Sequence, residues 1–70
     1  MYKVLILGGR GMLGHLVLRI LSEQETLLVE STSSKKIPNY IWFNIEEGIE
    51  SLNQIIEKYG PFNYIINCIG

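Results

Sequence analysis

The residues with the clearest chemical potential are three glycines, Gly8, Gly11 and Gly14, which stand three positions apart. They follow a short aliphatic run at residues 4–7 and precede a segment with helical periodicity. Glycine suits a tight turn between a strand and a helix, because it tolerates positive φ angles and close backbone approach. The free N–H groups and positive dipole end of the helix would then face phosphate groups. The spacing GxxGxxG therefore predicts a dinucleotide-binding turn.

Each glycine has a different predicted role. Gly8 takes the backbone angles of the turn, Gly11 admits the pyrophosphate, and Gly14 lets the helix lie close on the strand. The competing interpretation is a helix-entry turn in some other βα unit. A P-loop is excluded, because His15 and Leu16 stand where its phosphate-binding lysine and its hydroxyl residue would be needed.

The hydrophobic pattern predicts the elements that position these glycines. Residues 4–7 are uncharged and aliphatic, which is typical of a strand buried on both faces of a parallel sheet. The spacing i, i+3, i+4, i+7 and i+8 then predicts a helix with a buried face of Leu13, Leu16, Val17, Ile20 and Leu21. The exposed side of this helix would carry His15, Arg19, Ser22 and Glu23.

Two more strands are predicted in the middle of the chain. Residues 26–31 are predicted to form a second buried strand, and the short crossover places it parallel to the first. A loop at Pro38 separates it from a short aromatic strand at residues 40–44. Trp42 lies in this third strand. We expect it to pack against a helix rather than to line an adenine pocket.

The last third of the chain adds a helix and a strand. A second apolar stripe predicts a helix at residues 49–59. Gly60 and Pro61 follow directly and are typical of the end of a helix. Residues 64–69 are predicted to form the fourth strand. The predicted fold is therefore α/β, a partial Rossmann-type parallel sheet of four strands in the order 3-2-1-4 with helices packed on it.

Polar residues follow at the end of the second strand, where a dinucleotide fold places the adenosine ribose. They include Ser31, Thr32, Ser33 and Lys35. Glu30 could bind the ribose hydroxyls and would favour NAD, whereas the hydroxyls together with Lys35 and Lys36 suit the 2′-phosphate of NADP. A solvated polar loop is the third interpretation. We expect NADP as the cofactor.

Composition narrows the class of protein. The chain has 70 residues, of which 47% are hydrophobic and 19% charged, with a formal net charge of −1. This is the balance of a globular domain, and it predicts neither a nucleic-acid-binding surface nor a membrane span of ~20 apolar residues. The single cysteine, Cys68, excludes an internal disulfide, predicts no metal site and favours a cytoplasmic location.

Length suggests that the fold is incomplete. A domain of this size buries only about 60% of its unfolded surface, and nucleotide-binding α/β domains usually exceed ~100 residues. We expect residues 1–70 to be the N-terminal part of an NAD(P)-binding Rossmann domain, with the substrate domain absent. The outer edge of the fourth strand would have no partner, so we expect a homodimer or aggregation through it.

Several segments together resemble a known family. They are residues 5–15 (LILGGRGMLGH), residues 43–45 (FNI), Pro61, and residues 67–70 (NCIG). The chain resembles the start of extended short-chain dehydrogenases/reductases, most closely the dTDP-4-dehydrorhamnose reductase group of nucleotide-sugar enzymes. The resemblance covers essentially the whole chain, but only about the first quarter of such an enzyme.

The resemblance implies further cofactor-binding residues. Backbone at the phosphates would come from Arg10, Met12 and Leu13. Asn44 and Ile45 occupy the Asp-Val pair that contacts adenine in the family, with Asn in place of Asp. The segment that passes under the cofactor would comprise Asn67, Cys68, Ile69 and Gly70, with Cys68 as a wall residue. Relatives often carry a basic residue at the position of Ser33, which leaves NADP and NAD both open.

Catalytic residues of such enzymes include a Tyr-x-x-x-Lys pair, in which the tyrosine protonates the carbonyl oxygen. The positions four residues after the four tyrosines hold Ile6, Asn44, Asn63 and Cys68. No catalytic residue is therefore assigned, and we expect this chain alone not to transfer hydride. The implied parent is an NAD(P)-dependent reductase of a nucleotide-linked keto-sugar. A nucleotide-sugar epimerase or dehydratase and a non-catalytic nucleotide-binding regulatory module are the alternatives.

Overall fold

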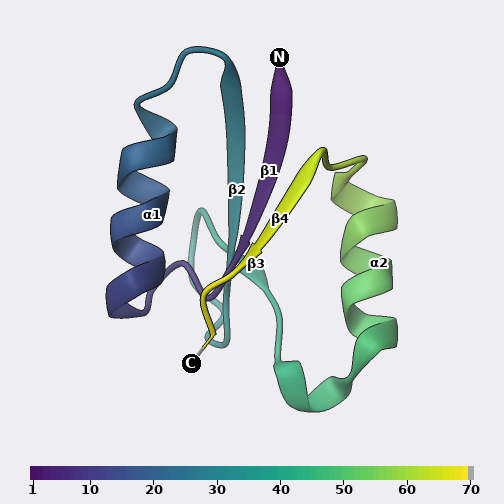
Figure 1. Ribbon diagram of the computed structural model, residues 1–70. Coiled ribbons are helices and arrows are strands. Elements are labelled where there is room, and N and C mark those ends of the chain that lie inside the picture. Colours follow the sequence, from purple (N-terminus) through teal and green to yellow (C-terminus); the bar gives the residue numbers. More distant parts are fainter. Residues whose placement is uncertain (70) are drawn as a thin grey trace.

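The computed structural model describes residues 1–69 and shows an all-parallel sheet in the order β3-β2-β1-β4. Its strands are β1 (Tyr2–Leu7), β2 (Leu27–Ser33), β3 (Ile41–Trp42) and β4 (Tyr64–Asn67). The helices are α1 (Met12–Ser22), the short 3₁₀ helix η1 (Ile45–Glu47) and α2 (Ile49–Tyr59). Helices α1 and α2 lie on opposite sides of the sheet (Figure 1). The predicted α/β architecture and strand order are confirmed.

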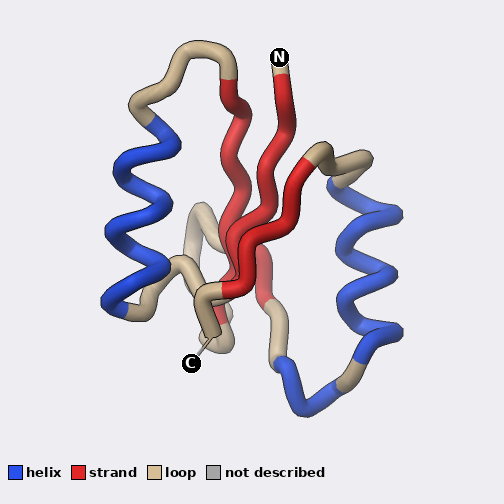
Figure 2. The backbone as a smooth tube through the Cα atoms, viewed as in Figure 1, coloured by secondary structure: helices blue, strands red, loops and turns tan. Residues whose placement is uncertain are grey.

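The strands all point the same way, so their carboxyl ends meet at one end of the sheet. In register, Val4 of β1 lies beside Val29 of β2 and Tyr64 of β4. Both long helices return antiparallel to the strands, and both therefore begin at this end (Figures 1 and 2). The glycine turn after β1 lies here as well, which places it between the two helix N-termini.

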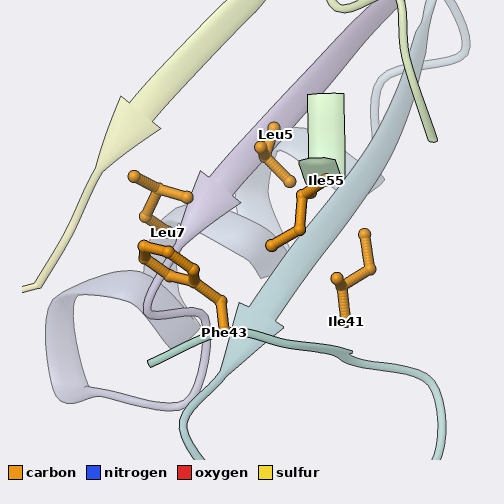
Figure 3. Packing of buried hydrophobic residues seen from close by; sticks show 5 residues of the cluster. All are labelled: Leu5, Leu7, Ile41, Phe43 and Ile55. Atoms are coloured by element: carbon orange, nitrogen blue, oxygen red, sulfur yellow. The ribbon is translucent and has the colours of Figure 1, made fainter. Parts of the chain in front are cut away.

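The core lies mainly between the sheet and α2. Its buried side chains come from β1, β3, the residue after β3, and α2 (Figure 3). They are Leu5, Leu7, Ile41, Phe43 and Ile55. Val4 and Ile6 are buried on the opposite face of β1, because successive side chains of a strand alternate between faces. Residues 4–7 of β1 are thus buried on both faces, as their aliphatic sequence predicts.

The buried face of α1 differs from the prediction. Gly14 is buried, whereas Leu13, Leu16 and Ile20 are 61%, 52% and 52% exposed. A Cβ atom at Gly14 would collide with the carbonyl oxygen of Gly8, so this residue must face the strand. Val17, Leu18 and Leu21 lie on the same side of the helix as Gly14 and are half-buried. The close contact at Gly14 therefore sets the rotation of the helix. Leu13, Leu16 and Ile20 of the predicted stripe face solvent, whereas Val17 and Leu21 keep the predicted side.

Strand ends also differ from the prediction. Thr32 and Ser33 belong to β2, because they pair with Ile41 and Trp42 of β3. Strand β4 ends at Asn67, whose side-chain oxygen accepts the N–H of Ile69 at 3.0 Å and so turns the chain. Helix α2 has the predicted bounds. No helix within residues 1–69 is long and apolar enough to cross a bilayer.

Candidate functional site

The turn between β1 and α1 is tied to the end of β2. Gly8 has φ +83° and its N–H donates to the Thr32 hydroxyl at 3.0 Å. The N–H of Gly9 donates to the Thr32 carbonyl oxygen, also at 3.0 Å. A Cβ atom at Gly8 would lie 2.9 Å from Cγ1 of Ile69. Both the positive φ and this contact require glycine, so the predicted turn role of Gly8 has a structural basis.

Gly11 is the N-cap of α1 and has a different environment. Its φ of −67° and ψ of 166° are open to any residue, and a Cβ atom here would meet only the Gly8 oxygen, at 3.6 Å. No side chain caps the helix, and its first turn has no acidic residue. The first N–H groups of a helix have no partner within it. Packing thus requires glycine at positions 8 and 14. At Gly11 there is room for a side chain, and this space lies in front of the N–H groups of the first turn of α1, which have no partner within the helix.

Two adjoining cavities open at this helix end. One has a volume of about 260 Å³ and the other about 340 Å³. Four residues line both cavities: Gly8, Gly11, Thr32 and Ser34. The cavities therefore form one continuous site that starts at the N-terminus of α1 and follows the carboxyl ends of β1 and β2.

The larger cavity is cationic. Arg10 and Lys35 line it together with Ser33, and none of its lining residues is acidic. The Ser33 hydroxyl accepts the N–H of Lys35 at 3.1 Å, which holds the start of the loop after β2. Lys36 instead places its ammonium group 4.9 Å from the centre of the Trp42 ring, on another surface. Arg10 and Lys35 thus supply two positive charges beside the free helix N-terminus.

The smaller cavity is more apolar. Its own lining residues are Phe43, Asn44, Ile45, Cys68 and Ile69. Phe43 is buried, and Asn44 accepts the N–H of Glu46 through Oδ1 at 3.0 Å. Apolar walls with a few polar groups are typical of a small-molecule pocket. This cavity suits a flat heterocycle, and the cationic cavity beside it suits phosphate.

Most predicted site residues meet at these two cavities. They are Gly8, Arg10, Gly11, Thr32, Ser33, Lys35, Asn44, Ile45 and Cys68. They come from four separate parts of the chain: the turn after β1, the end of β2, the segment after β3 and the segment after β4. The parallel sheet brings them together, because its strands end at the same edge.

Other predicted site residues line neither cavity. Met12, which is 95% exposed, lines neither cavity, and neither do Leu13 and Gly14. All three belong to the first turn of α1. Ser31 lies behind the turn, since a Cβ atom on Gly9 would be 2.6 Å from that of Ser31.

The other exceptions follow β4 or lie earlier in β2. Asn67 lines a neighbouring apolar cavity with Leu7 and Ile49. Gly70 lies outside the described residues. Glu30 lies within β2 beside Leu5 and lines neither cavity of the candidate site.

Two residues that line the cavities were not among the predicted site residues. Phe43 forms a wall of the smaller cavity, and Ser34 lines both cavities. Alternation along the third strand would have found Phe43, because it lies two residues after buried Ile41. Trp42 is 38% exposed, lines neither cavity of the site, and its indole N–H donates to the Ser34 carbonyl oxygen at 3.1 Å.

Among residues 1–69, no group of three His, Cys, Asp or Glu residues is placed to hold a metal ion. Comparisons of the chain with protein-family models, with curated proteins and with solved structures find no match.

Proposed function

We propose that this chain binds a nicotinamide dinucleotide, with NADP preferred to NAD, as the cofactor-binding part of a cytoplasmic reductase of a nucleotide-linked keto-sugar. The pyrophosphate would lie at the N-terminus of α1. The adenine would occupy the cavity lined by Phe43 and Ile45. Neither a nucleic acid nor a membrane is part of the proposal.

The observation that carries the proposal is the environment of Gly11. Packing excludes a side chain at Gly8 and at Gly14, but a Cβ atom at Gly11 would make only an ordinary contact. Gly11 nevertheless lines both cavities and precedes an uncapped helix without acidic residues in its first turn. Free N–H groups, the helix dipole and an open approach together favour a bound anion.

The preference for NADP is supported by the charges of the larger cavity. Arg10 and Lys35 line it beside the hydroxyls of Ser33 and Ser34. A 2′-phosphate there would accept charge-assisted hydrogen bonds from the two cations. Glu30, the residue that would favour NAD, lies earlier in β2 and lines neither cavity.

The reductase part of the proposal is supported by the resemblance to extended short-chain dehydrogenases/reductases. The nicotinamide would supply the hydride, and the residues of this chain would bind and orient the cofactor. Epimerase or dehydratase chemistry uses the same cofactor-binding half and stays an alternative. No tyrosine in the sequence is followed four residues later by lysine, so the function assigned to the chain itself is cofactor binding.

Calorimetric titration with NADPH and with NADH tests the proposal. We expect NADPH to bind at least about tenfold more tightly than NADH, a difference of about 1.4 kcal/mol that one charge-assisted contact can supply. Gly11→Ala should weaken both cofactors, because its methyl group would occupy the approach to the helix N–H groups. Met12→Ala is the matched control, since Met12 is the next residue and 95% exposed.

Each outcome has a defined meaning. Equal affinity for the two cofactors would contradict the NADP preference. Absence of binding by both would contradict the dinucleotide site, provided that circular dichroism shows a folded chain. Unchanged affinity in Gly11→Ala would show that the ligand does not approach the N-terminus of α1.

A further inference from the structure

Strand β2 ends in three consecutive hydroxyl residues, and all three are buried. Ser31, Thr32 and Ser33 are only 3%, 1% and 4% exposed. The strand lies between β1 and β3, so it has a paired neighbour on both sides. A buried hydroxyl costs free energy unless it forms hydrogen bonds. The partners of the last two hydroxyls therefore indicate what these side chains do.

The Thr32 hydroxyl holds the glycine turn. Its oxygen accepts the N–H of Gly8 at 3.0 Å, and the Thr32 carbonyl oxygen accepts the N–H of Gly9 at 3.0 Å. The Gly8 carbonyl oxygen in turn accepts the N–H of Gly11, the N-cap of α1, at 3.2 Å. A buried hydroxyl is thus connected through Gly8, the residue with φ +83°, to the start of the helix.

The Ser33 hydroxyl holds a different group. It accepts the N–H of Lys35 at 3.1 Å. Because successive side chains of a strand alternate between faces, Thr32 and Ser33 leave opposite faces of β2. Thr32 lines both cavities of the candidate site, whereas Ser33 lines only the cationic cavity, together with Lys35. The two neighbouring hydroxyls are therefore bonded to two different parts of the site.

We propose that Thr32 and Ser33 are positioning residues that divide cofactor recognition between them. Thr32 holds the turn that faces the pyrophosphate, which NADPH and NADH share. Ser33 holds the backbone of Lys35 beside the cationic cavity, where the 2′-phosphate of NADPH alone would lie. This division of roles depends on the proposed function. It acts through preorganisation, because a group that is held in place beforehand loses less freedom when the cofactor binds.

Calorimetric titration of two variants tests the role of Thr32. Thr32→Val removes the hydroxyl and keeps the branched shape, so NADPH and NADH should both bind about tenfold more weakly, with their affinity ratio unchanged. Thr32→Ser keeps the hydroxyl and should bind both cofactors within about twofold of the unaltered chain. Equal losses in the two variants, or a loss in Thr32→Val that affects NADPH alone, would overturn this role.

A double-variant cycle tests the role of Ser33. Ser33→Ala should weaken NADPH binding about threefold and leave NADH binding unchanged. Because Ser33 acts through Lys35, adding Ser33→Ala to Lys35→Gln should cause no further loss, whereas residues that act independently give additive losses. Additive losses would indicate a direct contact between Ser33 and the cofactor and would overturn the positioning role. An equal loss for both cofactors in Ser33→Ala would overturn it as well.

Amide hydrogen exchange of the unaltered chain gives a test that does not depend on a variant folding. The N–H of Gly8 should exchange at least about tenfold more slowly than that of Met12, which lies in the first turn of α1. Equally fast exchange at the two positions would overturn the role of Thr32. Absence of cofactor binding by the unaltered chain would contradict the proposed function itself. Binding that all the variants leave unchanged would contradict only the division of roles.

Discussion

The N-termini of α1 and α2 lie at the same end of the sheet but have opposite electrostatic surroundings (Figure 1). Each helix starts after a glycine, Gly11 or Gly48, and neither has a side-chain cap. The first turn of α1 contains no acidic residue, and Arg10 stands beside it. The first turn of α2 contains Glu50, and η1 just before it contains two more glutamates.

The difference favours the start of α1 over the start of α2 as the proposed place for a bound anion. At α2, negative side chains complement the positive end of the helix dipole. At α1, the same positive end lacks that complement and faces a cationic cavity lined by Lys35. A helix end left in this state is stabilised when an anion binds. This contrast supports the proposal that phosphate binds at the start of α1 and not at the start of α2.

The largest expected effect concerns the glycine that holds α1 on the sheet. In Gly14→Ala the new methyl group would collide with the backbone of Gly8, and the overpacking should cost about 3 kcal/mol of folding free energy. Gly11→Ala should cost only about 1 kcal/mol, the usual loss for alanine at an N-cap. Urea denaturation followed by circular dichroism measures both values. Equal losses would contradict the separation of structural and binding glycines.

A second variant makes the N-terminus of α1 resemble that of α2. Leu13 is 61% exposed in the first turn of α1, so Leu13→Glu supplies the missing negative charge. We expect the affinity for NADPH to fall at least about tenfold, while the folding stability rises by about 0.5 kcal/mol. Leu13→Gln has nearly the same shape without the charge and should change neither quantity much. Calorimetry and thermal denaturation give the two readouts, and unchanged affinity in Leu13→Glu would contradict the anion site.

A smaller effect distinguishes the two neighbouring lysines. Lys35 lines the cationic cavity, whereas Lys36 lies over the Trp42 ring. Lys35→Gln should weaken NADPH binding by about three- to tenfold and leave NADH binding unchanged, because only NADPH carries the 2′-phosphate. Lys36→Gln should leave both affinities as they are. Equal losses in the two variants would point to general attraction between charges instead of a 2′-phosphate contact.

The smallest effect belongs to α2. Glu50→Gln removes the negative charge from its first turn and should lower the folding stability by about 0.3 to 1 kcal/mol. Cofactor affinity should not change, because Glu50 lines neither cavity of the site. Thermal denaturation at low ionic strength detects the loss. A change in NADPH affinity would show that the two helix ends are not independent.

The sequence predicted the sheet well because its signals are local. Residues 4–7 are aliphatic throughout, and the glycines and proline that interrupt the pattern lie at element ends. The strand order then followed from general rules for parallel sheets. The rotation of α1 was not predictable from periodicity, because the contact between Gly14 and Gly8 outweighs the burial of Leu16 and Ile20.

The sequence predicted those site residues whose place follows from where a strand ends. Thr32 and Lys35 reach the cavities because β2 ends beside the glycine turn. Ser31 does not reach them, since it lies earlier in β2 and packs on Gly9. Facing direction changes with every residue of a strand, so an error of one or two residues at the strand end changes which side chains line the site.

The amide NMR spectrum of the chain during titration with NADPH tests the comparison of the two helix ends most directly. We predict that the largest shift changes fall on the N–H groups of Gly11, Met12 and Leu13, with little change at Gly48, Ile49 and Glu50. Shift changes centred on the start of α2, or none at the start of α1 while NADPH binds, would contradict the account.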